Sequence, residues 1–506
     1  MSSSTPGRLA ASSDPVAATS VRRALRDPAR LRTEVLAGLV VALALIPEAI
    51  SFSVIAGVDP RVGLFTSVTM AVTIAVVGGR PAMISAATGA IALVVAPVVR
   101  EHGIDYLVAT VLLGGLLQIV LSLLGVAKLM RFIPRSVMVG FVNALAILIF
   151  STQLPHLIGV PWLVYPMVAV GIAIIALLPR LTTVVPAPLV AIVLLTVVVV
   201  IAGWQVPTVG DQGELPESLP TLFWPQVPLT WETLRLIAPY AIGLALVGLI
   251  ESLMTAKLVD DITDTHSVKT REAWGQGVAN LVSGLFGGMG GCAMIGQTMI
   301  NVKVSGARTR ISTFLAGTFL LILVMLLGDI VAAIPMAALV AVMIMVSVAT
   351  FDWHSIAPAT LRRMPASATV IMLCTVAVTV ATRNLAYGVI VGVVVACLFF
   401  ARRVAHFTEV TSLPAEDPQT KTYAVRGPLF FASSNDLVYQ FDYVGDPERV
   451  VIDLADSQIY DSSTVAALDA IETKYHQHGK QVEIVGLNEP SLEWHGRLSG
   501  RLGAGH

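Results

Sequence analysis

Between Glu34 and Arg403 the chain consists of apolar runs separated by short clusters of charged residues. A helix needs about 20 apolar residues to cross the hydrocarbon core of a bilayer, and fewer where the span is broken or buried in protein. Fourteen runs meet this requirement, and two of them, 83–99 and 292–304, are short. The runs cover residues 34–56, 61–78, 83–99, 106–126, 133–152, 162–179, 184–203, 233–256, 272–287, 292–304, 310–328, 332–349, 367–382 and 385–401. The sequence therefore predicts an α-helical polytopic membrane protein with fourteen transmembrane segments.

The basic residues predict how these spans are oriented. Lys and Arg accumulate in cytoplasmic loops, so the arginines of segment 22–32 place the N-terminus in the cytoplasm. Loops after even-numbered spans are then cytoplasmic, and they hold Arg80, Lys128, Arg131, Arg135, Arg180, Lys257, Lys269, Arg271, Lys303, Arg308, Arg310, Arg362, Arg363, Arg402 and Arg403. The opposite loops hold only Arg61, Arg100 and Arg383, and loop 204–232 has no Lys or Arg. Both termini are therefore predicted to be cytoplasmic in a multi-pass protein of the cell membrane.

The two ends of the chain differ from the apolar part. Residues 1–30 are predicted to be a disordered cytosolic tail, because their first 20 or so residues are rich in Ser, Ala and Thr and lack the apolar core of a signal peptide. Residues 31–405 form the predicted membrane domain. Segment 408–500 has ordinary soluble composition and reads as a small α/β domain: strands in 423–431 around a Gly427-Pro428 turn, a strand at 449–454, a helix at 463–476 and a strand at 481–486. Strand–helix–strand predicts a parallel pair with a right-handed crossover.

The two halves of the membrane domain, about 34–203 and 233–401, show weak sequence similarity at corresponding positions. Leu-Ile stands just before a carboxylate in both span 1 and span 8, at Glu48 and Glu251. A Gly-Gly pair follows about 30 residues after the first acid and about 36 after the second, and each pair precedes a short span of small residues. With seven spans each, the halves must have opposite topology. Short, Gly-interrupted segments at corresponding positions of inverted repeats are a typical mark of a transporter's binding site.

The short spans 3 and 10 carry the predicted site. A helix that starts inside the membrane leaves unpaired N–H groups and a partial positive charge at its first turn. Two such ends facing each other would bind an anion without a buried Lys or Arg. The predicted substrate-binding residues are Ser85, Ala86, Ala87, Thr88, Gly291, Cys292, Ala293, Met294 and Gln297, with Thr298 as a further hydrogen-bonding side chain. The alternative is that these small residues only allow close helix packing.

Glu48 and Glu251 are the predicted coupling residues. An ionised carboxylate deep in the membrane is costly, so such acids are usually functional and can exchange protons near neutral pH. The alternative is that backbone donors satisfy each acid, which then only joins two helices. Asp260, Asp261 and Asp264 lie beyond the end of span 8 and are expected to form a solvated cytoplasmic face.

Other features exclude several classes of function. The net charge of −1 does not indicate a nucleic-acid partner. The three cysteines contain no Cys-x-x-Cys pair, which argues against a disulfide framework or a zinc site. The sequence shows no metal-ligand cluster, nucleophile–base pair or phosphate-binding loop, so we expect neither an enzyme nor a cofactor.

These residues resemble the sulfate permease (SulP) family of anion transporters over nearly the whole chain. The first span carries part of the resemblance and spans 8 to 11 carry the rest: Leu36-Ala-Gly38, Pro47-Glu48-Ala49, Ala56-Gly57-Val58-Asp59-Pro60, Glu251-Ser252-Leu253-Met-Thr255-Ala256, Gln276-Gly277-Val-Ala-Asn280, Gly284-Leu-Phe-Gly287-Gly288, Asn301 and Gly306-Ala-Arg308-Thr309. Segment 408–500 resembles the family's STAS (sulfate transporter and anti-sigma-factor antagonist) domain, through Val451-Ile-Asp-Leu454, Tyr460-Asp-Ser-Ser-Thr464 and Gly479-Lys-Gln-Val-Glu-Ile-Val-Gly486.

The resemblance implies the seven-plus-seven inverted-repeat fold shared with uracil permeases. A core domain of spans 1–4 and 8–11 carries an anion, held between the N-termini of spans 3 and 10, against a gate domain of spans 5–7 and 12–14, in a homodimer. In sodium-dependent bicarbonate members a cation binds a span 8 carboxylate, a Thr one turn later and the start of span 10. Glu251 and Thr255 match the first two positions, whereas the span 10 hydroxyl falls on Ile295 and the family's Asp is a Glu. Many members also carry Arg near Gln297. These departures favour proton over sodium coupling.

The resemblance also raises the question of regulation through the STAS-like segment. In anti-sigma-factor antagonists the Asp-Ser-Ser run carries a phosphorylated Ser at a helix N-terminus, where added negative charge is well placed. Ser462 and Ser463 stand in that run. In transporters the same run more often caps the helix.

Four readings of function remain open from the sequence. The chain is predicted to be a proton-coupled secondary transporter of sulfate, bicarbonate or a dicarboxylate; sodium coupling or anion exchange is the alternative. An uncoupled anion channel is compatible with the same fold. A nucleobase permease is disfavoured by the STAS-like segment and by the first span. The fourth reading is a sensor that signals through its soluble segment and transports nothing.

Overall fold

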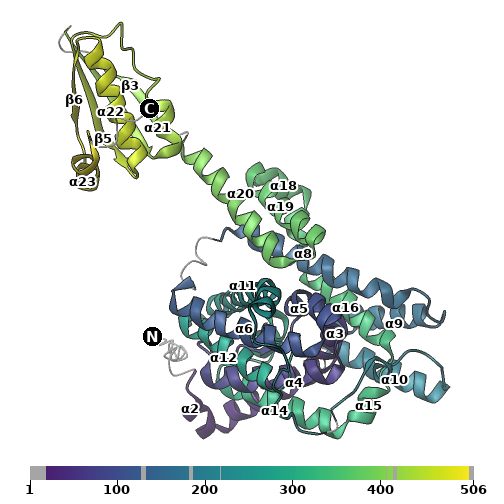
Figure 1. The fold of residues 1–506 in the computed structure, drawn as a ribbon. Coiled ribbons are helices and arrows are strands. Elements are labelled where there is room, and N and C mark those ends of the chain that lie inside the picture. Colours follow the sequence, from purple (N-terminus) through teal and green to yellow (C-terminus); the bar gives the residue numbers. More distant parts are fainter. Residues whose placement is uncertain are drawn as a thin grey trace, which may run out of the picture. The chain divides into compact units, whose positions relative to one another are not determined.

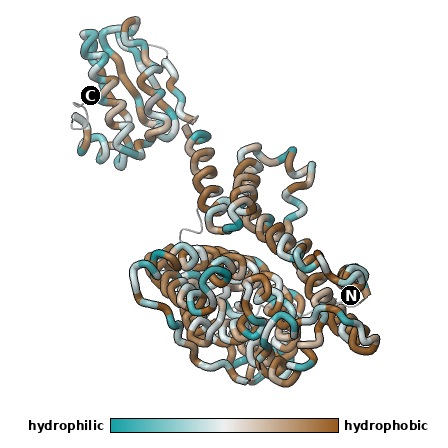
Figure 2. Tube along the Cα trace, turned by 45° about the vertical axis from the view of Figure 1, so that its right-hand side comes forward, coloured by the Kyte–Doolittle hydropathy of each residue, from teal (hydrophilic) through white to brown (hydrophobic). Residues whose placement is uncertain are grey.

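The computed structural model describes residues 19–126, 133–181, 186–216, 218–405, 407–413 and 419–500. It divides into two compact units at Gly392, inside helix α20 (Leu385–Ala405). The first unit contains the apolar helices and the second contains the soluble segment (Figure 1). The hydropathy colouring follows this division: the helices of the first unit are largely hydrophobic, and much of the second is hydrophilic (Figure 2).

The first half of the membrane unit begins with a short helix and continues with a long one that starts at a proline. Pro28 stands at the first position of α3, and the Asp27 carboxylate accepts hydrogen bonds from the N–H groups of Ala29 and Arg30. Because helix α2 begins at Val21, the predicted disorder does not extend to residue 30. Residues 1–18 lie outside the described part. The helices are α2 (Val21–Arg26), α3 (Pro28–Ala56), α4 (Pro60–Val77), α5 (Gly89–His102), α6 (Ile104–Leu123), α8 (Arg135–Gln153), α9 (Val164–Leu177) and α10 (Ala187–Ala202).

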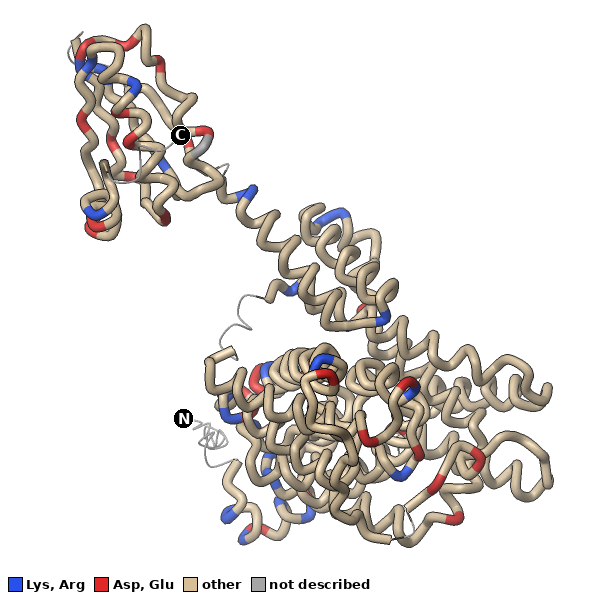
Figure 3. The backbone as a smooth tube through the Cα atoms, viewed as in Figure 1, with Lys and Arg blue, Asp and Glu red and all other residues tan. Residues whose placement is uncertain are grey.

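The second half repeats this order after a segment with little regular structure. Its helices are α11 (Trp231–Thr263), α12 (Lys269–Leu285), α13 (Ile295–Met299) with a π-helical continuation (Ile300–Val304), α14 (Arg310–Leu326), α15 (Gly328–Ala332), α16 (Met336–Thr350), α17 (Trp353–Ile356), α18 (Pro358–Arg363), α19 (Ala366–Thr382) and α20. Short 3₁₀ turns cover Leu154–Leu157, Leu178–Arg180 and Val209–Gln212. Each of the fourteen predicted spans coincides with a helical segment, and long stretches of these helices carry no charged residue (Figure 3).

Length and composition confirm a polytopic membrane protein. Among the described residues, six helices are long and apolar enough to cross a membrane: α3, α4, α6, α8 with its 3₁₀ turn, α11 and α20. Shorter apolar helices of 10–17 residues lie at α9, α10, α14, α16 and α19. The short spans 3 and 10 differ most from a plain helix, because each begins as an extended strand.

Helix packing divides the membrane unit into the two predicted groups. Helices α3, α4, α6, α11, α12 and α14 pack against one another, and α8, α9, α10, α16 and α19 form a second set. Glycines allow the closest approaches: a Cβ on Gly115 of α6 would lie 2.8 Å from the carbonyl oxygen of Gly277 on α12, and a Cβ on Gly277 would lie 2.6 Å from that of Gly115. The first group is the core domain and the second is the gate domain.

The soluble unit is a four-stranded sheet with the order β3-β4-β5-β6. Its strands are β3 (Glu409–Ser412), β4 (Thr420–Leu429), β5 (Arg449–Ile459) and β6 (Gln481–Val485). β3 and β4 are antiparallel, whereas β4, β5 and β6 are parallel, which confirms the predicted parallel pair. The accompanying helices are α21 (Phe431–Leu437), α22 (Ser462–Gln477) and α23 (Glu489–Leu498). Val465, Leu468 and Ile471 of α22 are fully buried in the hydrophobic core beside the strands.

The prediction of a turn at Gly427-Pro428 is wrong. Strand β4 continues through both residues, and its register against β5 shifts between Ala424 and Arg426. Gly427 has φ +100°, and a Cβ there would lie closer than van der Waals contact to the carbonyl oxygen of Phe407. The glycine therefore allows an irregularity within a continuous strand and does not end it.

Candidate functional site

The N-terminal ends of spans 3 and 10 meet in a two-stranded antiparallel pair. Strand β1 (Ser85–Ala86) pairs with β2 (Cys292–Ala293), so that Ser85 lies opposite Ala293 and Ala86 opposite Cys292. The pairing is close: a Cβ on Gly291 would lie well inside van der Waals contact with the carbonyl oxygen of Ala86. Only glycine fits at position 291 without moving the partner strand. The sequence placed Ser85, Ala86, Cys292 and Ala293 at helix starts, whereas the structure places them in this pair.

The helices themselves start directly after the paired strands. Helix α5 begins at Gly89, where the Thr88 hydroxyl accepts a hydrogen bond from the N–H of Ile91 at 3.4 Å. Helix α13 begins at Ile295, after Met294, and its first turn has no side-chain cap. Gly296 in that turn is exposed, and a Cβ there would meet no atom within 4 Å. Among the described residues the first turn of α13 therefore lacks a side-chain cap and borders open space at Gly296, which is the geometry expected of an anion site.

Glu251 is connected to this junction through Cys292. The thiol of Cys292 donates to the Glu251 Oε2 at 2.9 Å, and the same sulfur lies 3.1 Å from the Thr88 hydroxyl. The side chains of Cys292 and Thr88 are almost completely buried, and Glu251 is 8% exposed. A continuous hydrogen-bonded chain therefore runs from the carboxylate of α11 to the residue that caps α5.

Glu48 approaches the junction from the other half of the chain. It lies within α3, directly after Pro47, and its side chain is partly exposed. The side chain of Gln297, in the first turn of α13, is a neighbour of the Glu48 carboxyl group. The structure thus brings both predicted coupling acids to the two short spans, one through Cys292 and one through Gln297.

Thr255 lies one turn after Glu251 and is fully buried. Its hydroxyl donates to the backbone carbonyl oxygen of Glu251 at 2.8 Å, which is the usual helical contact of a threonine in an apolar segment. At the start of α13, Ile295 offers an aliphatic side chain, as the sequence predicted. Thr255 is therefore near Glu251, but its hydroxyl proton is directed to the helix backbone.

A set of buried polar side chains holds the strand pair in place. The amide of Asn280 exchanges two hydrogen bonds with the backbone of Gly291, at 2.8 and 3.0 Å. Ser85 accepts from the Gln276 amide at 2.7 Å, and Ser252 accepts from the N–H of Ala293 at 3.0 Å. The sequence did not predict a site role for Ser252, Gln276 or Asn280. A signal for the last two is present, because Gln276 and Asn280 are amides one helical turn apart in an apolar span.

The segment that leads into span 3 is anchored to the second half of the chain. The Arg80 guanidinium pairs with Asp260 at 3.0 Å, and the two side chains are 3% and 11% exposed. The backbone N–H groups of Gly79 and Arg80 both donate to the Glu272 carboxylate, at 2.7 and 2.8 Å. The expectation of a solvated face is therefore wrong for Asp260, which is the partner of a buried arginine.

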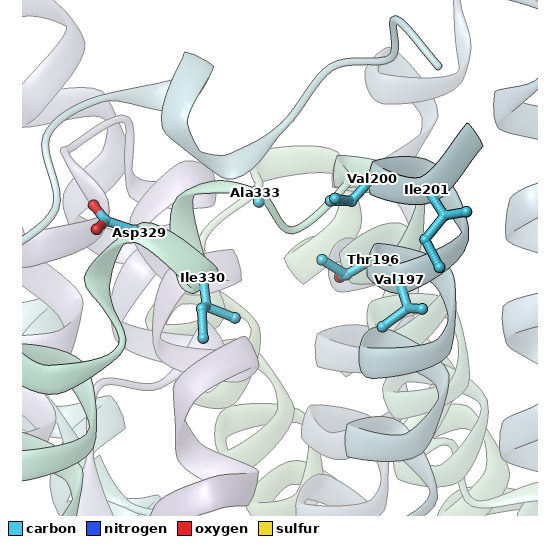
Figure 4. Close-up of a pocket in the computed structure, with 7 residues that line it drawn as sticks. All are labelled: Thr196, Val197, Val200, Ile201, Asp329, Ile330 and Ala333. Carbon is cyan, nitrogen blue, oxygen red and sulfur yellow. The ribbon is translucent and has the colours of Figure 1, made fainter. Parts of the chain in front are cut away.

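A pocket between α10 and α15 is separate from this junction. It has a volume of about 390 Å³ and is shown in Figure 4 with its lining residues, Thr196, Val197, Val200, Ile201, Asp329, Ile330 and Ala333. Ile330 and Val197 extend into the space between the two helices, and the carboxylate of Asp329 points away from it (Figure 4). The lining is mostly aliphatic, so this pocket does not have the chemistry of an anion site.

Known proteins share both parts of this architecture. Residues 31–171 and 163–375 match the sulfate permease family, and residues 414–493 match the STAS domain. The chain belongs to the sulfate permease family. It is 52% identical over 461 residues to the putative sulfate transporter YbaR of Bacillus subtilis strain 168. The alignment covers 91% of this chain and 95% of that protein. It is also 27% identical over 511 residues to the bicarbonate transporter BicA of Picosynechococcus, covering 90% and 88%.

Solved structures of related transporters have the same fold as this member of the family. The transmembrane domain of a cyanobacterial BicA superposes with a TM-score of 0.63 at 25% identity, covering 73% of this chain and 98% of that one. The murine anion transporter Slc26a9 in its inward-facing state gives a TM-score of 0.79 at 16% identity, covering 92% and 87%. The fold is therefore that of a helical membrane transporter followed by a STAS domain, as the sequence predicted.

Proposed function

We propose that this protein is a proton-coupled secondary transporter of a small anion of the sulfate, bicarbonate or dicarboxylate class. The observation that carries the proposal is the hydrogen-bonded chain from Glu251 through Cys292 to Thr88, at the junction where α5 and α13 begin. Relatives named as sulfate and bicarbonate transporters support the anion class. In this proposal the protein is a homodimer in the cell membrane, with both termini cytoplasmic.

The predicted substrate site is the open space beside the first turn of α13, facing the start of α5. Backbone N–H groups at both helix ends supply positive potential, and Gln297 supplies a side-chain donor. All nine predicted substrate residues are buried, so apart from the Gln297 side chain, contact with the anion is through backbone groups at the edge of the strand pair. We propose no Lys or Arg as a ligand, which suits an anion that must leave again.

Proton coupling follows from the position of the two acids. An ionised Glu251 or Glu48 places negative charge beside the helix ends and repels an anion there, whereas the protonated acid does not. Proton and anion therefore bind together more favourably than either alone, and an inward proton gradient drives anion uptake. Protonation of Glu251 also gives it a donor, so that the acid can donate to the sulfur of Cys292 as well as accept from it.

Uptake into proteoliposomes tests the proposal. A panel of sulfate, bicarbonate and dicarboxylates is offered under a proton gradient and, separately, under a sodium gradient. We expect saturable uptake driven by the proton gradient for at least one anion, and its loss in Glu48→Gln and in Glu251→Gln. Glu232→Gln is the matched control, because Glu232 is exposed in the first turn of the same helix α11.

Other outcomes point to the alternatives. Normal uptake in both glutamine variants would contradict the coupling role of the acids. Uptake that follows the sodium gradient and is lost in Thr255→Val would favour the sodium-coupled alternative, since Thr255 lies one turn from Glu251. Large unitary currents in planar bilayers would instead indicate a channel.

A further inference from the structure

A second pocket, with both basic and apolar residues in its lining, lies in the gate domain, away from the strand pair. It has a volume of about 390 Å³ and is formed by the first turns of α8 and α19 and by the short helices α17 and α18. Arg135, His354 and Arg363 are its basic residues, and Val139, Met364 and Met372 are among its apolar ones. The transport proposal uses none of these side chains.

The two arginines are available to a ligand. Both are exposed, and within the described part of the chain neither makes a hydrogen bond or an ion pair. The acid that lines the same pocket, Asp352, is engaged elsewhere: its Oδ1 accepts from the N–H groups of His354 and Ser355 at 3.1 and 3.3 Å and so caps α17. Within the described part of the chain Asp352 forms no ion pair with either arginine, so the lining carries two guanidinium charges against one carboxylate and is positive on balance.

The segment around the pocket has the character of a membrane-surface element. Helices α17 and α18 connect α16 to α19, and they expose Trp353, Ile356 and Leu361 at 58%, 43% and 38%. Arg362 and Arg363 close α18 on the side that the charge pattern assigns to the cytoplasm. Exposed Trp and aliphatic side chains next to arginines are typical of helices that lie in the interface of a bilayer.

We propose that this pocket binds the phosphate headgroup of an anionic membrane lipid. Planar guanidinium groups hold phosphate oxygens through paired N–H donors, and Arg135 and Arg363 present two of them from different helices. An acyl chain lies along Val139, Met364 and Met372, which a free inorganic anion would not use. Basic pockets between helices at the cytoplasmic surface are suited to such headgroups.

Binding there acts on the gate domain. Helices α8 and α19 are in close contact near the pocket, where a Cβ on Gly140 would lie 2.8 Å from the Cβ of Thr375 and 2.9 Å from the carbonyl oxygen of Met372. A lipid that contacts Val139 on α8 and Met372 on α19 therefore joins the two helices at their cytoplasmic ends. We expect it to stabilise the gate domain without entering the transport site.

Native mass spectrometry and thermal unfolding of the full-length protein in detergent test this inference. The probes are phosphatidylglycerol, phosphatidylcholine and inorganic phosphate. We expect phosphatidylglycerol to bind and to raise the unfolding temperature, phosphatidylcholine to bind more weakly, and millimolar phosphate to have no effect. The double variant Arg135→Gln/Arg363→Gln should lose most of the phosphatidylglycerol effect. Arg362→Gln is the control, because Arg362 is exposed on the same helix but does not line the pocket.

The inference is overturned if the double variant binds phosphatidylglycerol as the unmodified protein does, or if Arg362→Gln loses as much. A shift with inorganic phosphate equal to that with lipid would also overturn it, because the site would then recognise a free anion. If the double variant does not fold, Arg363→Gln alone, at an exposed position, is compared with Arg362→Gln by the same two measurements.

Discussion

Cys292 connects groups that come from opposite halves of the chain. Its sulfur contacts the carboxylate of Glu251 on α11 and the hydroxyl of Thr88 at the start of α5. A thiol can donate one hydrogen bond and accept another weakly, so it can pass a change in the protonation of Glu251 to Thr88. Thr88 in turn caps the helix whose N-terminus faces the proposed anion site. The side chain is therefore placed to link proton and anion binding.

Substitution of Cys292 separates this role from simple packing. We expect Cys292→Ser to retain pH-dependent uptake, since a hydroxyl can both donate and accept. Cys292→Ala should leave the fold intact but reduce the dependence of uptake on external pH, because the chain from Glu251 to Thr88 is broken. The measurement is the initial rate of uptake as a function of pH in proteoliposomes. Equal pH profiles for the two variants would show that the thiol only fills space.

Substitution by alanine should affect substrate binding at one glycine of the junction and stability at another. At Gly296 an added methyl group enters open space beside the first turn of α13, so Gly296→Ala should fold normally and raise the KM for the anion several-fold. At Gly291 the methyl group would clash with the carbonyl oxygen of Ala86, so Gly291→Ala should lower the unfolding temperature. Uptake kinetics and thermal unfolding are measured on both. An unchanged KM in Gly296→Ala would place the substrate elsewhere.

The short spans depend on contacts with other elements more than on their own helical propensity. Each begins as a two-residue strand, and each strand is hydrogen-bonded to the other half of the chain. The segment before span 3 is held by Glu272 and by the pair of Arg80 with Asp260. These contacts keep the helix starts of α5 and α13 at fixed positions relative to each other. The geometry of the proposed site is therefore a property of the assembled core domain.

The pair of Arg80 and Asp260 should be important for stability. Because the Arg80 side chain is 3% exposed and that of Asp260 11%, removing the carboxylate leaves a buried arginine without its ion-pair partner, which typically costs about 3 kcal/mol. We expect Asp260→Asn to lower the unfolding temperature of the purified protein clearly. Asp261→Asn should have little effect, since Asp261 is exposed at the next position of the same helix. Similar unfolding temperatures for the two variants would mean that solvent replaces the lost carboxylate.

The distribution of charge along the whole chain predicts its orientation in the membrane. Ser218 lies in the loop without Lys or Arg, and Ser463 lies at the start of α22 in the soluble unit; both are exposed. We expect a membrane-impermeant maleimide to label Ser218→Cys in intact cells and Ser463→Cys only after lysis. The unmodified protein serves as the background control for its own three cysteines. Labelling of Ser463→Cys in intact cells would reverse the predicted topology.

The number of spans could be predicted from the sequence, because the bilayer requires a minimum length of apolar residues that any short segment shows by itself. The two acids could be placed within spans because a carboxylate is rare inside such a run. The pairing of the two halves at spans 3 and 10 was also predicted, from the repeated acid and Gly-Gly pair. The resemblance in the soluble segment correctly indicated a STAS domain. The extent of strand β4 could not be predicted. A glycine such as Gly427 is compatible with a bulge inside a strand and with a turn at its end, and only the neighbouring strands decide between them.

The contacts within the junction could be known only from the tertiary structure. Ser85 and Ala86 are strand residues because Cys292 and Ala293, more than 200 positions later, offer them hydrogen bonds. Asp260 is largely shielded from solvent because it pairs with Arg80 from the other half. Cys292 bridges Glu251 and Thr88 because the same packing of the two halves brings them together. Local sequence encodes apolar length and periodicity, whereas these partners are set by how the two repeats pack, which no local pattern records.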